Sequence, residues 1–483
     1  MNRELRRVTF VVMAMFLALF VSSTNLQVLS ADSLANDQRN VRAIYDGYQT
    51  KRGAILVDSQ PIADSTPAAD AFHFNRNYSG NMYSSVTGFY SYFQGATGLE
   101  SSANDYLSGK NSAQFFEQLN SLFSGNPVSG ASIELTIDPK VQQAAFEALG
   151  DKTGAVVAIE PTTGNILAMV STPSFDANKL AVHSGSKAQK NYNQLLSAKG
   201  DPLINKAIGG SLYTPGSVFK LVVAAAALES GEYRVTSELP NPRSYTLPGT
   251  STKIRNAGNS DCGGKPTVTL LDALRLSCNI PFAELGVALG QDKIRNMAKA
   301  FGFGQNIRIP TVATASTYPE NMDDAQTALS AFGQFDVRVT PLQMAMITSA
   351  IANGGKEMRP NLIENVQSSN LALLSQSTPS EFASPISKST ADGLKKMMIA
   401  AVATGVSGNG AVPGTVVAGK TGTAQNGKNA PYTLWFAGFA PADNPKVAVV
   451  VMVADGGGFG QNGTGNALAA PIARKVIKAV LNR

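Results

Sequence analysis

Three short motifs hold the side chains that could perform covalent chemistry on a carbonyl carbon. Ser217 and Lys220 form an S-x-x-K motif. Ser277 and Asn279 form S-x-N, and residues 420–423 read Lys-Thr-Gly-Thr. A serine hydroxyl is a weak nucleophile until a neighbouring base takes its proton. The motifs therefore predict acyl transfer through a serine, provided that the fold brings a basic amine close to it.

The first motif opens the most helical stretch of the chain, residues 218–228. A Pro-Gly pair directly before Ser217 is typical of a helix start. Ser217 and Lys220 would then lie three residues apart on one helix face, within hydrogen-bonding reach. Burial and the positive potential of a helix N-terminus both disfavour a charged lysine. We therefore expect a neutral Lys220 to accept the proton of Ser217.

Each motif is a weak signal when it stands alone. A second S-x-x-K occupies residues 184–187, where we expect a loop with no helix behind it, and S-x-N recurs at residues 368–370 and 407–409. Residues 420–423 lie between two strand-like segments, where Gly422 at a sheet edge would let a ligand backbone approach closely. The order of the three motifs, each in a fitting setting, is the strong signal.

Composition excludes several other classes of protein. The 483 residues are 15% charged with a formal net charge of +6, so neither a coiled coil nor a charge-rich disordered chain is expected. The basic residues are scattered, and no nucleic acid partner is predicted. The histidines are His73 and His183 alone, and no Cys/His cluster occurs. A Ser-His-Asp triad, a metal site and a cofactor are therefore not expected.

The N-terminal segment has the features of a membrane-targeting sequence. Residues 8–31 include no charged side chain, and residues 8–29 are long enough to cross a bilayer as one helix. Arg3, Arg6 and Arg7 precede this stretch, so the positive-inside rule keeps residues 1–7 cytoplasmic and exports the rest. We expect a retained single-pass anchor with an extracytoplasmic catalytic domain. A cleaved signal peptide is the alternative.

The sequence contains two cysteines, Cys262 and Cys278, both in the part expected to be exported. Such a pair can persist as a disulfide outside the cytoplasm. Closing a loop of about 16 residues would stabilise the fold by roughly 3 kcal/mol in the chain-entropy model. The alternative is two buried free thiols.

Residue composition and apolar periodicity divide the exported part of the chain into two regions. Residues 32–50 predict a stalk or a first helix, and residues 78–130 predict loops and short helices. Residues 139–149 have helical spacing, and residues 154–170 predict a β-hairpin with a Gly turn. Strands are also expected within residues 433–454, near the other end of the large domain. We therefore predict an α+β fold in which both ends of that domain meet in one sheet.

Residues 130–483 resemble the penicillin-binding protein and serine β-lactamase superfamily. Segments outside the three motifs resemble the high-molecular-weight transpeptidases: residues 136–142, 157–171, 331–334 and 339–345. With Arg52-Gly53 and Gly98-Leu-Glu100 in the N-terminal region, the chain resembles class B penicillin-binding proteins. It is most similar to the actinobacterial group whose S-x-N motif also reads Ser-Cys-Asn.

The resemblance implies a domain order along the chain. Residues 1–7 would be a cytoplasmic tail, 8–29 a transmembrane anchor and 30–139 a small dimerisation or pedestal-like domain. Residues 140–483 would form the penicillin-binding transpeptidase domain, an antiparallel sheet with helices on both sides.

The resemblance also implies D,D-transpeptidation of peptidoglycan stem peptides that end in D-Ala-D-Ala, a reaction inhibited by β-lactams. Ser217 would be the nucleophile and Lys220 its base. Ser277 would relay protons to the leaving amine and from the acceptor amine. Asn279 would bond the substrate amide.

The third motif would recognise the end of the peptide. Lys420 would hold its carboxylate and polarise the S-x-N serine. Thr421, Gly422 and Thr423 would bind or flank the substrate, and the backbone N–H groups of Ser217 and Thr423 would form the oxyanion hole. One donor of this kind supplies roughly 3 kcal/mol of transition-state stabilisation.

Two departures from the family pattern concern the rim of the cleft. Phe335 replaces the glycine that commonly follows Gly333-Gln334. Cys278 is the middle residue of S-x-N, and a bridge to Cys262 would tie the rim to an upstream loop. Our hypothesis is that this bridge stiffens the rim and takes no part in chemistry.

Other functions stay open at this point. A D,D-carboxypeptidase or a β-lactamase would share the acyl-serine step and differ in deacylation. A non-catalytic scaffold or sensor would bind the ligand without transfer. The resemblance also implies a partner, a membrane-embedded glycan polymerase of the shape, elongation, division and sporulation (SEDS) family.

Overall fold

The protein is described here by a computed structural model that covers residues 3–35, 50–115, 118–119, 123 and 129–483. Most of the stalk expected at residues 32–50 therefore lies outside the described residues, as does part of the stretch at residues 78–130. The described part of that stretch contains short helices and two-residue strands, as predicted.

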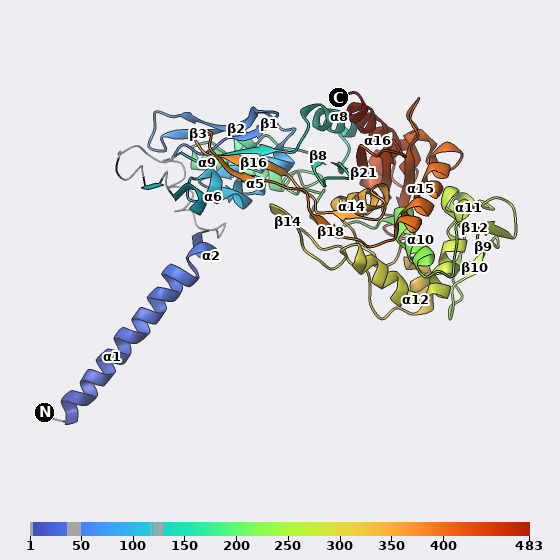
Figure 1. Ribbon diagram of the computed structural model, residues 1–483, viewed down its shortest axis with the longest axis horizontal. Coiled ribbons are helices and arrows are strands. Elements are labelled where there is room, and N and C mark those ends of the chain that lie inside the picture. The colour runs from blue at the N-terminus through green and yellow to red at the C-terminus, as the bar shows by residue number, and fades with distance from the viewer. Residues whose placement is uncertain (1–2, 36–49, 116–117, 120–122, 124–128) are drawn as a thin grey trace.

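A long apolar helix leads the chain. α1 (Arg3–Thr24) continues into a π-helical turn (Asn25–Leu29), and the short α2 (Ala31–Ala35) follows. The segment Leu5–Leu29 is apolar and long enough to span a membrane, and none of its apolar window is buried in the protein. Figure 1 shows α1 projecting away from the body of the molecule. The predicted anchor at residues 8–29 corresponds to this helix.

A five-stranded antiparallel sheet lies at the centre of the large domain, in the order β19-β20-β21-β7-β8. Its strands are β7 (Gly154–Ile159), β8 (Ile166–Thr172), β19 (Ala418–Ala424), β20 (Thr433–Ala440) and β21 (Val447–Val453). The predicted hairpin and the meeting of both domain ends in one sheet are therefore confirmed. β19 lies at one edge, so one side of its backbone is free of strand neighbours.

Helices cover both faces of this sheet. α8 (Pro139–Leu149) and α16 (Gly465–Leu481) pack on one face, and α14 (Pro341–Ala352) packs on the other (Figure 1). Every residue of β7, β8, β20 and β21 is buried, which explains why these strands read as continuous apolar runs without alternation. The architecture agrees with the predicted sheet between helical layers.

A six-stranded sheet forms the N-terminal domain, in the order β17-β16-β6-β1-β2-β3. Its strands are β1 (Ile55–Val57), β2 (Gln60–Pro67), β3 (Phe74–Tyr78), β6 (Ser132–Leu135), β16 (Ile363–Gln367) and β17 (Leu373–Gln376). β16 and β17 come from far along the chain. The domain boundary between residues 139 and 140 stays a prediction, and two strands from beyond it complete this sheet.

The remaining helices connect and support the two sheets. They are α4 (Ser84–Thr87), α5 (Gly98–Ser102), α6 (Asn104–Leu107), α9 (Gly185–Leu196), α10 (Lys220–Glu229), α11 (Leu270–Arg275), α12 (Ile280–Ala300), α13 (Asp324–Ser330) and α15 (Lys388–Ala403). Short pairs of strands fill the connections: β4 (Tyr90–Ser91) with β5 (Gly95–Ala96), β9 (Glu238–Pro240) with β12 (Thr267–Thr269), β10 (Tyr245–Thr246) with β11 (Lys253–Ile254), β13 (Ile307–Ile309) with β14 (Thr311–Ala313), and β15 (Glu357–Met358) with β18 (Glu381–Ala383).

Candidate active site

Ser217 lies in a 3₁₀ turn, Gly216–Phe219, that runs directly into α10. The helix predicted at residues 218–228 is thus present, with a tighter first turn. Gly216 has a positive φ of 55° and donates its N–H to the Gly333 carbonyl oxygen over 2.9 Å. This bond ties the turn to the loop after α13. Ser217 is half-buried beside the edge strand β19.

Lys220 is completely buried and bonds to the S-x-N motif. Its Nζ donates to the Ser277 carbonyl oxygen over 2.8 Å and to Asn279 Oδ1 over 2.9 Å, and it lies 3.5 Å from Ser277 Oγ. No hydrogen bond between Ser217 and Lys220 occurs among those of the described residues. The direct bond expected from helix spacing is therefore not formed in this conformation, because the ammonium group turns toward Ser277.

Burial lowers the pKa of Lys220 well below its usual value, and the positive charge of Lys420 lowers it further. A buried ammonium loses hydration, and a second cation nearby adds repulsion. Both effects favour the neutral amine. The expectation that Lys220 can act as a base agrees with these directions.

Lys420 lies on the edge strand β19 and is also completely buried. Its Nζ donates to Ser277 Oγ over 2.7 Å and to the Thr421 carbonyl oxygen over 2.8 Å. Burial lowers the pKa of Lys420 to about 7. Ser277 has a positive φ of 61°, an uncommon conformation for a serine. The site thus holds one strained serine between two desolvated amines.

The S-x-N turn is anchored by a residue that the sequence did not single out. Asn256 Oδ1 accepts the backbone N–H of Asn279 over 2.8 Å and that of Ile280 over 3.0 Å. These are the first backbone donors of α12, which would otherwise lack partners. Asn256 is buried. No local pattern around position 256 distinguishes it from other polar loop residues.

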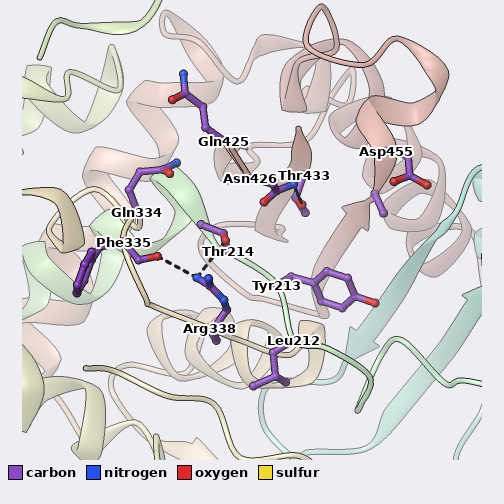
Figure 2. Close-up of a pocket in the computed structure, with 11 residues that line it drawn as sticks. Leu212, Tyr213, Thr214, Gln334, Phe335, Arg338, Gln425, Asn426, Thr433 and Asp455 are labelled. Atoms are coloured by element: carbon purple, nitrogen blue, oxygen red, sulfur yellow. Dashed lines mark hydrogen bonds between the residues drawn. The ribbon is translucent and has the colours of Figure 1, made fainter. Parts of the chain in front are cut away.

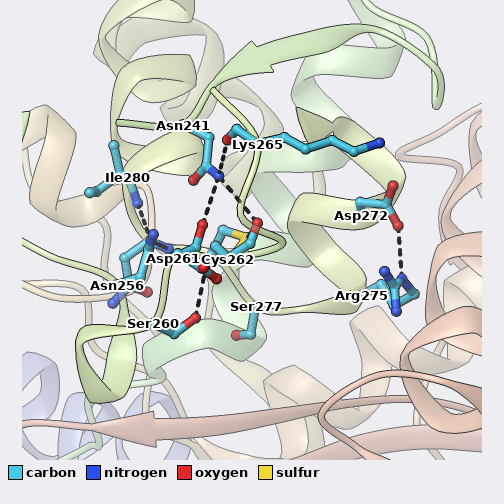
Figure 3. The surroundings of a disulfide bond; sticks show 12 residues. Asn241, Asn256, Ser260, Asp261, Cys262, Lys265, Asp272, Arg275, Ser277 and Ile280 are labelled. Carbon is cyan, nitrogen blue, oxygen red and sulfur yellow. Dashed lines mark hydrogen bonds and ion pairs between the residues drawn. A yellow bond between two sulfur atoms is a disulfide. The ribbon is translucent and has the colours of Figure 1, made fainter. Parts of the chain in front are cut away.

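Cys262 and Cys278 form a disulfide, with their Cα atoms 5.8 Å apart. Both side chains are buried, and Asn241 donates its amide to the carbonyl oxygens of Asp261 (3.0 Å), Cys262 (3.2 Å) and Lys265 (2.9 Å). Figure 3 shows these bonds around the bridge, with Ser277 close by. The pairing predicted from the two cysteines is confirmed, and the alternative of two free thiols is wrong.

The threonines of the third motif have different surroundings. The Thr421 hydroxyl is buried and lies 3.1 Å from Ser407 Oγ. The half-exposed Thr423 accepts the Gly465 N–H at its Oγ1 over 3.2 Å. Ser407 therefore supports the strand, a role that the recurrence of S-x-N at residues 407–409 did not reveal.

Gly422 allows a close approach, as predicted, but the neighbour belongs to the same chain. A Cβ at this position would lie 2.9 Å from the Pro215 carbonyl oxygen and 3.2 Å from a methyl carbon of Val218. The glycine thus lets β19 pack directly against the turn that carries Ser217.

A cavity of about 430 Å³ borders residues 212–214, which precede the Ser217 turn, and residues 425–426, which follow β19 (Figure 2). It is lined by Tyr213, Thr214, Gln334, Phe335, Arg338, Gln425, Asn426 and Asp455, among others. Phe335 has a positive φ of 59°, the conformation that a glycine adopts easily, so the loop keeps the backbone shape typical of glycine at this position. Arg338 donates to the Phe335 carbonyl oxygen over 2.9 Å and supports this shape.

The second S-x-x-K motif requires a correction. Residues 184–187 form the start of a helix, α9, where a loop with no helix behind it was expected. Its apolar stripe is short, because only Ala188, Tyr192 and Leu195 lie at helical spacing among mostly polar residues, so the helical signal is weak. Lys187 is exposed, whereas Lys220 is completely buried. Burial of the lysine therefore separates the two motifs, and the presence of a helix does not.

The fold and the site together define the class of active-serine acyltransferases. Comparisons with known proteins agree with this class. A family model described as "Penicillin binding protein transpeptidase domain" matches residues 154–478, and one described as "Penicillin binding protein A dimerisation domain" matches residues 52–133. The chain belongs to the penicillin-binding protein transpeptidase family.

Individual relatives match over the full length of the chain. Peptidoglycan D,D-transpeptidase PbpA of Mycolicibacterium smegmatis is 40% identical, with 100% of this chain and 99% of the relative covered. The PbpA of Mycobacterium tuberculosis is 39% identical with the same coverage. A solved structure of penicillin-binding protein A from M. tuberculosis, as its penicillin G acyl-enzyme complex, matches with a TM-score of 0.84 and 38% identity over 89% of this chain and 100% of that one.

Proposed function

We propose that the chain is a serine-type peptidoglycan D,D-transpeptidase. Ser217 Oγ attacks the carbonyl carbon of the penultimate D-Ala of a stem peptide, and its proton passes to Lys220. The C–N bond then breaks, and the terminal D-Ala leaves as an amine that takes up a proton. An amine of a neighbouring stem peptide attacks the resulting ester, forms the cross-link and frees Ser217.

The remaining residues of the site have distinct roles in this proposal. Ser277 carries protons between Lys220 and the leaving or entering amine, because its hydroxyl contacts both buried lysines. Asn279 orients the substrate amide. Lys420 holds the terminal carboxylate by charge, and the accessible hydroxyl of Thr423 flanks it.

The oxyanion hole consists of the backbone N–H groups of Ser217 and Thr423. A developing negative charge there is stabilised by donors that are already oriented. Gly422 keeps these two donors close, since it lets β19 approach the Ser217 turn. Thr421 positions the strand through Ser407.

The observation that carries this function is the arrangement of one hydroxyl between two amines. Ser277 Oγ lies 2.7 Å from Lys420 Nζ and 3.5 Å from Lys220 Nζ, and both lysines are shielded from water. A solvated surface motif would leave its lysines charged and exposed. This arrangement supplies a neutral base, a relay and a cation for the carboxylate in one place.

Covalent labelling with penicillin G tests the proposal. The intact protein should gain the mass of the drug on the tryptic fragment that contains Ser217, and Ser217→Ala should abolish the adduct. Ser184→Ala is the matched control, because it removes the serine of the second S-x-x-K motif and should label normally. Unlabelled Ser217 in folded wild-type protein would refute the acyl-enzyme.

The lifetime of the adduct separates a transpeptidase from a hydrolase. A stable adduct supports transfer, whereas rapid turnover would indicate a β-lactamase. With a D-Ala-D-Ala donor, cross-linked product formed when an acceptor amine is added supports transfer, and free acid alone would indicate a carboxypeptidase. A scaffold without transfer predicts that Ser217→Ala still supports wall growth.

We also propose that α1 anchors the chain in the cytoplasmic membrane with the catalytic domain outside. The basic residues before the helix and the disulfide, which is typical of an oxidising compartment, support this orientation. The anchor and N-terminal domain would dock a SEDS-family glycan polymerase. Thiol-labelling of engineered surface cysteines in intact cells tests the orientation, and co-purification of the polymerase with the full chain tests the partner.

A further inference from the structure

The outer edge of β19 exposes backbone groups at alternate residues, because an edge strand pairs on one side only. Thr421 shows which residues face outward: its N–H donates to Ser407 Oγ over 3.1 Å, and its carbonyl oxygen accepts from Lys420 Nζ. Thr423 and Gln425, two and four residues on, therefore present their backbone groups to the same side. An incoming peptide would extend the sheet along this edge.

Gln334 already occupies the last of these positions. With the amide oriented so that both of its groups are satisfied, Nε2 donates to the Gln425 carbonyl oxygen over 3.2 Å and Oε1 accepts the Gln425 N–H over 3.1 Å. A side-chain amide offers the same donor and acceptor as a peptide unit. The Gln334 amide thus takes the place of one peptide unit of an additional strand.

The backbone around Gln334 holds this amide in position. Its own N–H donates to the Leu329 carbonyl oxygen over 3.1 Å at the end of α13. The preceding Gly333 has a φ of 76°, and a Cβ there would lie 2.0 Å from the Gly216 carbonyl oxygen. The loop is therefore packed directly against the residue before Ser217, with little freedom to shift.

Thr423 is the outward position left between two occupied ones. At Thr421 the backbone bonds to Ser407 and Lys420, and at Gln425 it bonds to Gln334. A bound peptide can pair at Thr423 without displacing any of these bonds. Pairing one unit further upstream requires the Gln334 amide to leave.

We propose that Gln334 is a specificity-determining residue that limits how much of the stem peptide pairs with β19. The proposal rests on the proposed transpeptidase function. In the wild type, an upstream part of the peptide that pairs with Gln425 must displace the two hydrogen bonds made by the Gln334 side chain. The number of hydrogen bonds made at Gln425 therefore does not increase. The upstream part of the peptide instead enters the adjoining cavity of about 430 Å³, which Gln334 and Gln425 border (Figure 2).

Two synthetic donors that differ by one peptide unit test this proposal on the full chain in detergent. Acetyl-D-Ala-D-Ala reaches only Thr423, whereas acetyl-L-Lys-D-Ala-D-Ala also reaches Gln425. The measured quantity is the ratio of kcat/KM for the longer donor to that for the shorter one. Gln334→Ala frees the Gln425 pair, so the ratio should rise about fivefold or more, the size of one to two net hydrogen bonds.

Two further variants control for size and for remote effects. Gln334→Leu keeps most of the bulk but can neither donate to nor accept from Gln425, so it should also raise the ratio. Gln143→Ala removes an exposed amide on α8 that bonds to Glu147, and it should leave the ratio unchanged. Penicillin G acylation and thermal melting report whether each variant is folded.

An unchanged or lowered ratio in both Gln334 variants would overturn the proposal. A rise in the alanine variant alone would also overturn it, since that result assigns the effect to added space. If neither donor acylates the wild type while penicillin G does, the D-Ala-D-Ala function fails instead. The two failures are therefore distinguishable.

Discussion

Lys420 Nζ lies 2.7 Å from Ser277 Oγ, and Lys220 Nζ lies 3.5 Å from the same oxygen. Two cations this close in a buried site repel each other, so one of them loses its proton at a lower pH. The pKa of Lys220 is lowered both by burial and by the charge of Lys420. These directions support our proposal that Lys220 acts as the base and that Lys420 keeps a charge for the substrate.

This division predicts a bell-shaped pH dependence of acylation by penicillin G. The second-order rate should rise with pH as Lys220 becomes neutral. It should fall above about pH 7 as Lys420, whose pKa is lowered to about 7, loses the charge that binds the drug carboxylate. Stopped-flow acylation measured across neutral pH checks both limbs. The methyl ester of penicillin G lacks that carboxylate, so its acylation rate should not fall at high pH. If penicillin G itself acylated the protein as fast at high pH as near pH 7, the role of Lys420 would be contradicted.

Ser277→Ala should slow acylation about 10²- to 10³-fold, because it removes the hydroxyl that joins the two amines, and proton relays contribute roughly this much. Ser368→Ala is the matched control. Ser368 is the serine of another S-x-N motif and bonds to Asn370 in the turn between β16 and β17, outside the site. The rate of that variant should match the wild type. Equal rates in both variants would remove Ser277 from the mechanism.

Replacing the disulfide tests whether it stiffens the rim. Cys262→Ser combined with Cys278→Ser should lower the free energy of unfolding by about 3 kcal/mol, as expected for a closed loop of this length. Acylation should slow as well, since Cys278 lies between Ser277 and Asn279. Denaturant titration and stopped-flow measurement give the two quantities.

The control for the disulfide experiment is reductant. Reductant should lower the free energy of unfolding of the wild type and leave that of the double variant unchanged. Recovery of both thiols in free form from exported protein, by non-reducing peptide mapping, would end the hypothesis. An acylation rate equal to that of the wild type, measured on the folded double variant, would also contradict the hypothesis.

Replacing Glu100, which lies far from the cleft, should strongly lower the stability of the protein. The Glu100 carboxylate is completely buried and pairs with Arg52 Nε at 2.6 Å and Arg76 Nε at 2.7 Å. Burial opposes its ionisation, but the two arginines together lower its pKa below the usual value. Glu100→Gln leaves two buried cations without a counter-charge. The free energy of unfolding should fall by about 3–5 kcal/mol.

An exposed ion pair provides the comparison for Glu100. Glu232 pairs with Lys293 at the surface, and Glu232→Gln should change the free energy of unfolding by less than about 1 kcal/mol. Denaturant titration of both variants checks the difference. A small effect at Glu100 would mean that the arginines find other partners.

Many of the local elements follow from the sequence. The hairpin at residues 154–170 and the helix at residues 139–149 were predictable because apolar spacing repeats with the period of a strand or a helix. The disulfide was predictable because one pairing is possible between two cysteines. The three motifs indicated the chemistry through their order and the structural setting of each.

Other features depend on contacts between distant segments. The short apolar stripe of α9 becomes visible only where Tyr192 and Leu195 pack against the core. β16 joins the N-terminal sheet from more than 200 residues beyond β6 in the chain. Gln334 reaches Gln425 only because α13 ends against Gly216. No local period in the sequence encodes these pairings.

The sequence by itself determined the candidate residues for the chemistry, since residue type and motif order are local properties. The tertiary structure decided how those residues are used. Helix spacing favoured a bond from Lys220 to Ser217, whereas packing directs the amine to Ser277 and Asn279. The pKa of a lysine depends on how completely it is buried and on what charge lies beside it, and both are set by the folded chain.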